Sequence, residues 1–97
     1  MTKAEIAERI VMETQLSRED VVATVNEFME SVKLAMINGE NVYLRGFGSF
    51  IIKTRAEKTG RNISKNTTIK IPAHNIPAFK PAKVFVEAIK TNTEVAV

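Results

Sequence analysis

The stretch from Lys53 to Pro72, KTRAEKTGRNISKNTTIKIP, decides how the rest of the chain must be built. It holds six basic residues, one acid and three large apolar residues, all isoleucines, so it cannot bury a core of its own. Extended runs on either side of a polar tip predict a β-hairpin. An isolated hairpin is only marginally stable in water, so this one needs either a folded body at its base or a partner along its length. Its positive charge favours a polyanion as that partner.

The net charge of +3 is unevenly distributed along the chain. Residues 1–40 hold four Lys/Arg and eight Asp/Glu, which gives −4, whereas residues 41–86 hold nine Lys/Arg and one Glu, which gives +8. Residues 87–97 contribute −1, from one Lys and two Glu, and the three parts sum to +3. A basic charge gathered on the hairpin half favours a nucleic-acid binder, and a solvated basic surface is the alternative.

Length and composition limit what the chain can do. Its 97 residues suffice for one domain, and with the hairpin set aside the remaining core is small enough to favour oligomerisation. There is no cysteine and one histidine, His74, which excludes disulfides, thiolate metal sites and histidine-rich metal sites. No nucleophile, histidine and acid set can be assembled, so we expect no enzyme, no cofactor and no small-molecule substrate. No secretory signal or membrane-spanning run is visible, which favours a cytoplasmic protein.

The first 39 residues predict two helices. Thr2 and Glu5 form a capping-box pattern that starts a helix over about residues 3–14. Ser17 is a second start signal, and apolar residues then recur at three- and four-residue spacing until Asn38-Gly39, which ends the helix. Because this pair is acidic overall and its second helix is apolar along much of its length, we interpret it as a packing scaffold rather than a helix-turn-helix that reads DNA.

The rest of the chain predicts a three-stranded antiparallel sheet, the hairpin arm and a final helix, and thus an α+β fold. Alternation in the second strand places Phe50 and Ile52 on one face, opposite Ile51 and Lys53. Phe47, Phe50 and Phe79 of two copies could cover the open sheet face around a two-fold axis. The expected elements are a strand at 42–45, a turn at 46–48, a strand at 49–55 that continues into the arm, a returning strand at 68–71, a short extended piece at 78–80, a helix at 82–90 and a tail at 91–97.

Four short motifs follow one another in the second half of the chain: Gly46-Phe47-Gly48-Ser49-Phe50, Arg55 to Asn62 (RAEKTGRN), Ile69 to Ala73 (IKIPA) and Pro77 to Pro81 (PAFKP) followed by Lys83. With these motifs the chain resembles the HU / integration host factor family of bacterial nucleoid proteins, and the resemblance covers residues 1–90 in order and without gaps. Any one of them would be a weak signal, but their combination at these spacings is highly specific.

The resemblance implies an intertwined dimer, with itself or with a paralogue, that binds double-stranded DNA with little or no sequence specificity in the nucleoid of the bacterial cytoplasm. Two β-arms would wrap the minor groove and bend the duplex, a mode for which this family supplies the standard examples. On this resemblance, residues 1–97 form a single domain with five parts. They are a helical dimerisation scaffold (1–39), a sheet body (40–52 and 73–81), a DNA-binding arm (53–72), a C-terminal helix (82–90) and a tail (91–97).

Carried onto this chain, the resemblance implies the DNA contacts. Ile63 falls on the wedge position that inserts between base steps, and Asn62 lies beside it. The body flank that meets bent DNA carries Lys3, Lys80 and Lys83. The arm contacts are Lys53, Arg55, Lys58, Arg61, Lys65 and Lys70, and the implied dimer core is Phe28, Val32, Leu44, Phe47, Phe50 and Phe79.

The chain departs from the family pattern at three places. Isoleucine stands at position 63 where the family commonly has proline, and Lys65-Asn66 stand where a Thr-Gly turn is common. Ala82 replaces a glycine at the start of the final helix. Ile63 can still insert between bases, and Asn66 tolerates the left-handed conformation of a hairpin turn.

Three alternatives stay open from the residues alone. One is a bender that prefers particular sequences, like integration host factor. Another is a protein-interaction module whose basic arms grip an acidic partner. Binding of RNA or single strands is less favoured, because the arm has no aromatic residue on which bases could stack.

Overall fold

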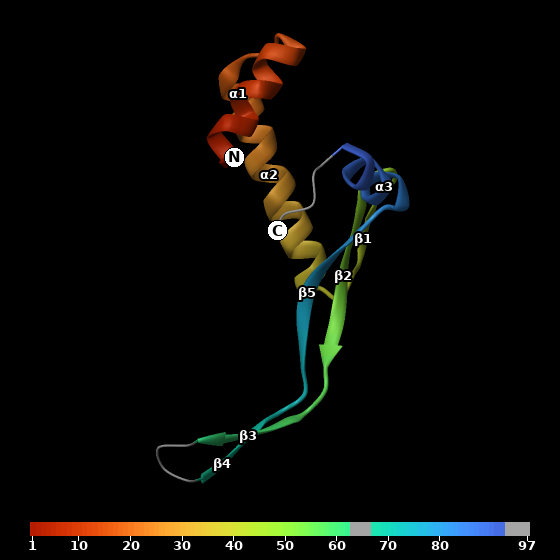
Figure 1. Ribbon diagram of the computed structural model, residues 1–97. Coiled ribbons are helices and arrows are strands. Elements are labelled where there is room, and N and C mark those ends of the chain that lie inside the picture. The colour runs from red at the N-terminus through yellow and green to blue at the C-terminus, as the bar shows by residue number, and fades with distance from the viewer. Residues whose placement is uncertain (63–66, 93–97) are drawn as a thin grey trace.

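The computed structural model describes residues 1–62 and 67–92, with the backbone alone for residues 61, 62 and 67. Its elements run in the order α1, α2, β1, β2, β3, β4, β5 and α3. The two N-terminal helices lie at one end of the molecule, the sheet runs away from them, and the arm extends from the far end (Figure 1). This is the α+β arrangement expected from the sequence.

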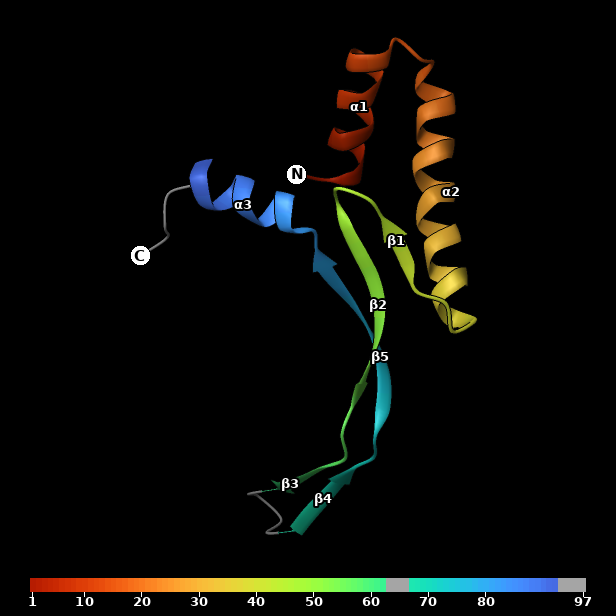
Figure 2. The same cartoon turned by 90° about the vertical axis from the view of Figure 1, so that its right-hand side faces the viewer.

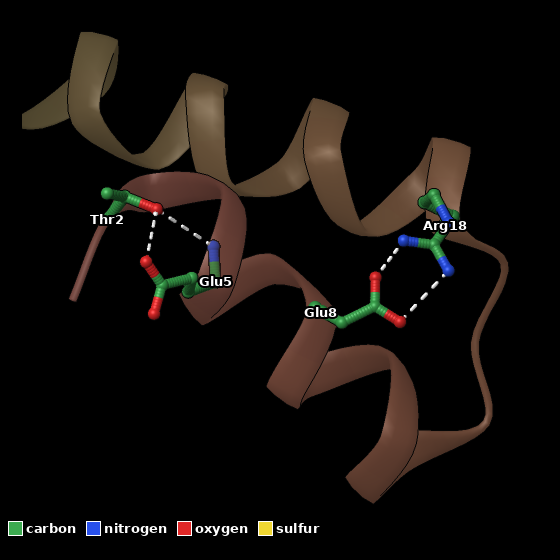
Figure 3. A network of polar contacts seen from close by, with 4 residues as sticks. All are labelled: Thr2, Glu5, Glu8 and Arg18. Carbon is green, nitrogen blue, oxygen red and sulfur yellow. Dashed lines mark hydrogen bonds and ion pairs between the residues drawn. The ribbon is translucent and has the colours of Figure 1, made fainter.

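Helices α1 (Lys3–Thr14) and α2 (Arg18–Ile37) form an antiparallel hairpin (Figure 2). The Thr2 hydroxyl accepts a hydrogen bond from the Glu5 amide at 3.2 Å, which confirms the predicted cap. It also donates to the Glu5 carboxylate at 3.2 Å (Figure 3). The Glu5 side chain therefore reaches back to the hydroxyl of the capping residue.

The start and end of α2 also agree with the sequence. Ser17 caps the helix by accepting from the Asp20 amide at 3.1 Å. Asn38 is the C-terminal cap, and Gly39 follows with a φ of 87°, a left-handed conformation that glycine adopts without steric cost. Local backbone chemistry therefore fixes both ends of this helix.

Polar contacts and two buried side chains hold α1 against α2. Glu8 and Arg18 form a two-pronged ion pair between α1 and α2, with Arg18 Nη2 3.0 Å from Glu8 Oε1 (Figure 3). Lys3 Nζ donates to Asn26 Oδ1 at 2.9 Å. Among the described side chains, the buried apolar ones are Ala7 and Val21. They lie on α1 and α2 respectively, so the best-buried part of the chain lies on the two helices.

Replacing Thr2 with alanine should lower the free energy of unfolding by about 1 kcal/mol, because the Glu5 amide loses its acceptor. Urea unfolding followed by circular dichroism measures this difference. Thr24→Ala is the matched control: that hydroxyl donates to the Asp20 carbonyl at 2.7 Å within α2 and caps no free amide. An equal loss in both variants would contradict the capping role.

The body of the molecule is a three-stranded antiparallel sheet. It is made of β1 (Val42–Leu44), β2 (Gly48–Arg55) and β5 (His74–Pro81) in the order β1-β2-β5. The sequence predicted an extended piece only at 78–80, and this was too short, since β5 has eight residues. β5 is an edge strand, and an edge accommodates Pro77, which has no N–H to donate to a further strand.

The arm is a separate two-stranded sheet of β3 (Lys58–Asn62) and β4 (Thr67–Ile71). The prediction that the second strand runs on into the arm was wrong, because β2 ends at Arg55 and residues 56–57 are not paired. They face residues 72–73, where Pro72 cannot donate a ladder hydrogen bond. The ribbon changes direction at this break (Figure 2). The arm is therefore joined to the body by two unpaired dipeptides.

The final helix, α3 (Lys83–Asn92), follows β5 at the end of the sheet that is remote from the arm. Phe85 of this helix stacks on Phe47, with ring centroids 5.6 Å apart. Phe47 also lies 5.2 Å from Phe79, which lies 5.0 Å from Phe50. These four rings tie α3 to the sheet.

One chain does not enclose the residues that the resemblance assigns to a dimer core. Phe28 and Phe47 are each 47% exposed and Phe79 is 40% exposed, while Val32, Leu44 and Phe50 are half-buried. The radius of gyration is 19.2 Å, against about 13 Å for a compact domain of this length. The exposed aromatic surface and the extended shape both favour a second subunit.

Candidate nucleic-acid interface

The pairing register gives the body sheet two faces of different chemistry. Arg55 lies directly opposite His74, Lys53 opposite Ile76, and Ser49 opposite Lys80. Because alternate residues of a strand point to the same face, Lys53, Arg55 and Lys80 share one side. We call these three residues the basic face. All three side chains are exposed.

The other side of the sheet is apolar. Phe50 lies opposite Phe79 and Ile52 opposite Pro77, as the predicted alternation in β2 requires. The end of α2 lies over this side, where Met36, Ile52 and Pro77 help to line a mainly apolar cleft of about 340 Å³. The side of the sheet with the basic face also carries Ile51, Ile76 and Ala78. Its three cations are nevertheless exposed, which makes this the side that can meet a polyanion.

A second basic surface lies where β5 passes into α3. Lys80 and Lys83 line a cleft of about 350 Å³ together with Arg45, Ser49 and Tyr43. Arg45 was not among the contacts expected from the sequence, although it lies within the basic half of the chain and directly before the Gly46 turn. Tyr43 is 72% exposed. The structure therefore brings Lys80 and Lys83 to one cleft and adds Arg45 to them.

His74 lies at the junction of the body with the arm. It is exposed, it faces Arg55 across the strands, and its Nδ1 lies 3.0 Å from the Pro72 carbonyl oxygen. His74 is therefore an exposed polar residue at the base of the arm.

The cations of the arm do not all lie on one side. Lys58 pairs with Ile71 and Thr59 pairs with Lys70, so Lys58 and Lys70 lie on opposite faces of the ribbon. Lys70 Nζ is 3.1 Å from Glu57 Oε1. Both lysines are exposed, so the arm presents positive charge on both of its faces.

Several predicted contacts fall at the arm tip or on the helices. The backbone of Arg61 pairs with that of Thr68, and the backbone of Asn62 pairs with that of Thr67. For Arg61 and Asn62 the structure describes the backbone and not the side chain. Ile63 and Lys65 lie outside the described residues. Lys3 is held against Asn26 of α2 and is not part of the basic face.

The comparison with known proteins decides the class of this interface. The family model described as "Bacterial DNA-binding protein" matches residues 1–90. The chain belongs to this family.

Relatives of the chain include both HU proteins and integration host factor subunits. The chain is 38% identical over 90 residues to the DNA-binding protein HU of Thermus thermophilus, covering 93% of each chain. It is 37% identical over 90 residues to integration host factor subunit beta of Shewanella amazonensis, covering 92% of this chain and 95% of the relative. The resemblance predicted from the sequence is therefore confirmed.

The fold agrees with a solved complex. An Anabaena HU–DNA cocrystal structure matches with a TM-score of 0.85 and 31% identity, covering 92% of this chain and 97% of that chain. HU from Thermotoga maritima matches with a TM-score of 0.64 and 25% identity, covering 92% and 98%. The predicted α+β fold is confirmed, and architectural DNA binding as a dimer is the function of the family. In the described part of the chain, no helix has the length and apolarity needed to cross a membrane.

Proposed function

We propose that two copies of this chain form a dimer that binds double-stranded DNA with little sequence preference and bends it between a pair of arms. The observation that carries the proposal is the basic face: Lys53, Arg55 and Lys80 lie on the side of the sheet opposite the phenylalanine rings. A duplex lying on this face would meet the arm at its edge. The protein would act by binding alone, without catalysis, and would compact the nucleoid in the bacterial cytoplasm.

Each part of the chain has a role in this proposal. Residues 1–39 and the apolar side of the sheet hold the dimer together, residues 40–52 and 73–81 form the body, and residues 53–72 form the arm that follows the minor groove. On the body flank, Arg45 joins Lys80 and Lys83 as a phosphate contact, because the three line one cleft. The arm tip supplies Arg61, Asn62, Ile63 and Lys65, whose roles come from the family resemblance.

Affinity for DNA should fall steeply with salt, because neutralising phosphates with lysine and arginine releases condensed counterions. We expect log K to decrease linearly with log salt, losing at least about tenfold between about 50 and about 200 mM. Fluorescence anisotropy with a short duplex of random sequence measures the slope. An affinity for DNA that does not change across this range of salt would refute the proposal. A protein that binds no DNA, but retains an acidic protein partner after nuclease treatment, would refute it too.

Replacing Ile63 with alanine should reduce DNA bending more than DNA affinity, because an apolar wedge unstacks a base step whereas cations provide most of the attraction. Energy transfer between dyes at the two ends of a duplex measures the bend angle, and anisotropy measures affinity. Ser64→Ala, next to the wedge position in the sequence, is the control and should leave the bend angle unchanged. Equal bend angles with the wild-type and Ile63→Ala proteins would contradict the wedge.

The similarity to integration host factor subunit beta favours a second candidate, a bender that prefers particular sequences and pairs with a paralogue. Selection from a random duplex library separates the two. If the purified chain selects duplexes that share a consensus sequence, it prefers particular sequences. If the selected duplexes share no sequence but are still bent by the protein, binding is non-specific.

A further inference from the structure

The chain has four glycines, and the fold itself requires three of them. Gly39 and Gly46 have φ values of 87° and 83°, which disfavour any side chain. A Cβ atom on Gly48 would lie 2.6 Å from Phe79 Cζ and 2.7 Å from the Lys80 carbonyl oxygen, so no side chain fits there.

Gly60, in the middle of β3, has no such reason to be glycine. Its φ is not in the left-handed region, and it pairs one-to-one with Ile69 in a regular ladder without a bulge. A Cβ atom there would come no nearer than 3.8 Å to another group, the Ile69 carbonyl oxygen, which is an ordinary contact. Glycine also weakens a strand interior, by roughly 0.5–1 kcal/mol relative to alanine. In a strand it often marks a bulge, a tight bend, or the close approach of a ligand or of another backbone. The regular ladder speaks against the first two, and the 3.8 Å to the nearest backbone atom excludes close approach of another part of the described chain.

The face that Gly60 belongs to is apolar and open. Side chains directly opposite each other share a face, so Gly60 and Ile69 lie on the same side as Lys58 and Ile71. Ile69 is 48% exposed and Ile71 is 43% exposed, although both are large apolar residues on a ribbon with no core. The result is a half-buried glycine without a side chain beside two exposed isoleucines, with one lysine toward the base of the arm.

The opposite face of the ribbon is polar. It carries Thr59 and Lys70, which pair with each other, and Thr68. All three are exposed, and Lys70 is joined to Glu57. The two faces therefore differ enough to meet a DNA groove differently.

We propose that Gly60 is the point at which the arm backbone lies closest to the duplex, and that the face formed by Gly60, Ile69 and Ile71 is turned toward the deoxyribose edges of the groove. This inference rests on the proposed DNA binding. The C–H surfaces of the sugars bury the two isoleucines, Lys58 reaches a phosphate at the groove rim, and the missing side chain at Gly60 allows the backbone to approach. The polar face with Thr59 and Lys70 points away from the groove floor, and Lys70 lies toward the phosphates at the groove rim.

The test compares added bulk on the two faces of β3. In the full-length protein at fixed salt, Gly60→Ala should weaken binding to a random duplex by about threefold and Gly60→Val by about tenfold or more. Thr59→Val on the opposite face should stay within about twofold of the wild type. The slope of log K against log salt should be the same in all four proteins, because no cation is removed.

A measurement on the free protein separates lost contacts from a damaged arm. Alanine and valine favour strands more than glycine does, so amide hydrogen exchange over residues 58–62 and 67–71 should be as slow as in the wild type or slower. Weaker binding from a better-ordered arm supports the proposal. Wild-type affinity in Gly60→Val, or an equal loss in Thr59→Val, would overturn it. A wild-type protein that bound no duplex would instead refute the proposed function itself.

Discussion

Replacing Phe79 with alanine should lower the free energy of unfolding by about 3 kcal/mol or more. The ring lies 5.2 Å from Phe47 and 5.0 Å from Phe50, so its loss removes the centre of the aromatic cluster. It also packs against the bare backbone of Gly48, where no side chain could fill the gap. In a dimer the effect grows, because the exposed part of the ring is available to the partner subunit. Urea unfolding at several protein concentrations measures both contributions, since the stability of a dimer depends on concentration.

Tyr43→Ala is the matched control for this experiment. It removes an aromatic ring from the same sheet, but this ring is 72% exposed and its hydroxyl accepts only a 3.3 Å hydrogen bond from Asn41 Nδ2. Its loss should change the free energy of unfolding by no more than about 0.5 kcal/mol. If Phe79→Ala is no more destabilising than Tyr43→Ala, the phenylalanine cluster is not the core of the body.

Removing Lys53 and Arg55 together should weaken DNA binding by at least about 2 kcal/mol, which is roughly 30-fold. Both residues belong to the basic face and lie two positions apart on β2. Among the described residues, no carboxylate forms an ion pair with Lys53 or with Arg55. If each contacts one phosphate in both subunits of the dimer, the double alanine variant should also show a salt slope that is smaller by about four. Anisotropy titrations over a salt series measure affinity and slope in one experiment.

The control for this variant removes the same charge from elsewhere. Lys33 lies on α2, where it pairs with Glu30 at 2.7 Å, and Lys90 lies in the last turn of α3. Alanine at both positions lowers the net charge equally but takes no cation from the basic face. We expect a change within about threefold and an unaltered salt slope. An equal loss in the two double variants would mean that overall charge, and not the position of Lys53 and Arg55, governs binding.

Signals that act within a few residues were predicted correctly from the sequence. Thr2 and Ser17 satisfy free amides at the helix starts, and Gly39 ends α2, because capping depends only on residues within one turn. The alternation that separates Phe50 from Lys53 is also local. The errors lay where a partner strand decides the outcome. β5 is longer than predicted because an edge tolerates Pro77, and β2 stops at Arg55 because Pro72 faces the break.

For the candidate DNA-binding site, too, some features followed from the sequence and others depended on strand pairing. The sequence by itself determined the kind of partner, because six cations between residues 53 and 72 cannot serve a core, and the family motifs identified that partner as DNA. Only the tertiary structure decided which residues act together. The β2–β5 register places His74 opposite Arg55 and Lys80 opposite Ser49, and the turn into α3 brings Arg45 to Lys83. In the arm, pairing puts Lys58 and Lys70 on opposite faces and leaves Gly60 beside exposed isoleucines. Composition and spacing describe the chain in one dimension, whereas a binding surface depends on which strands pair and in which register.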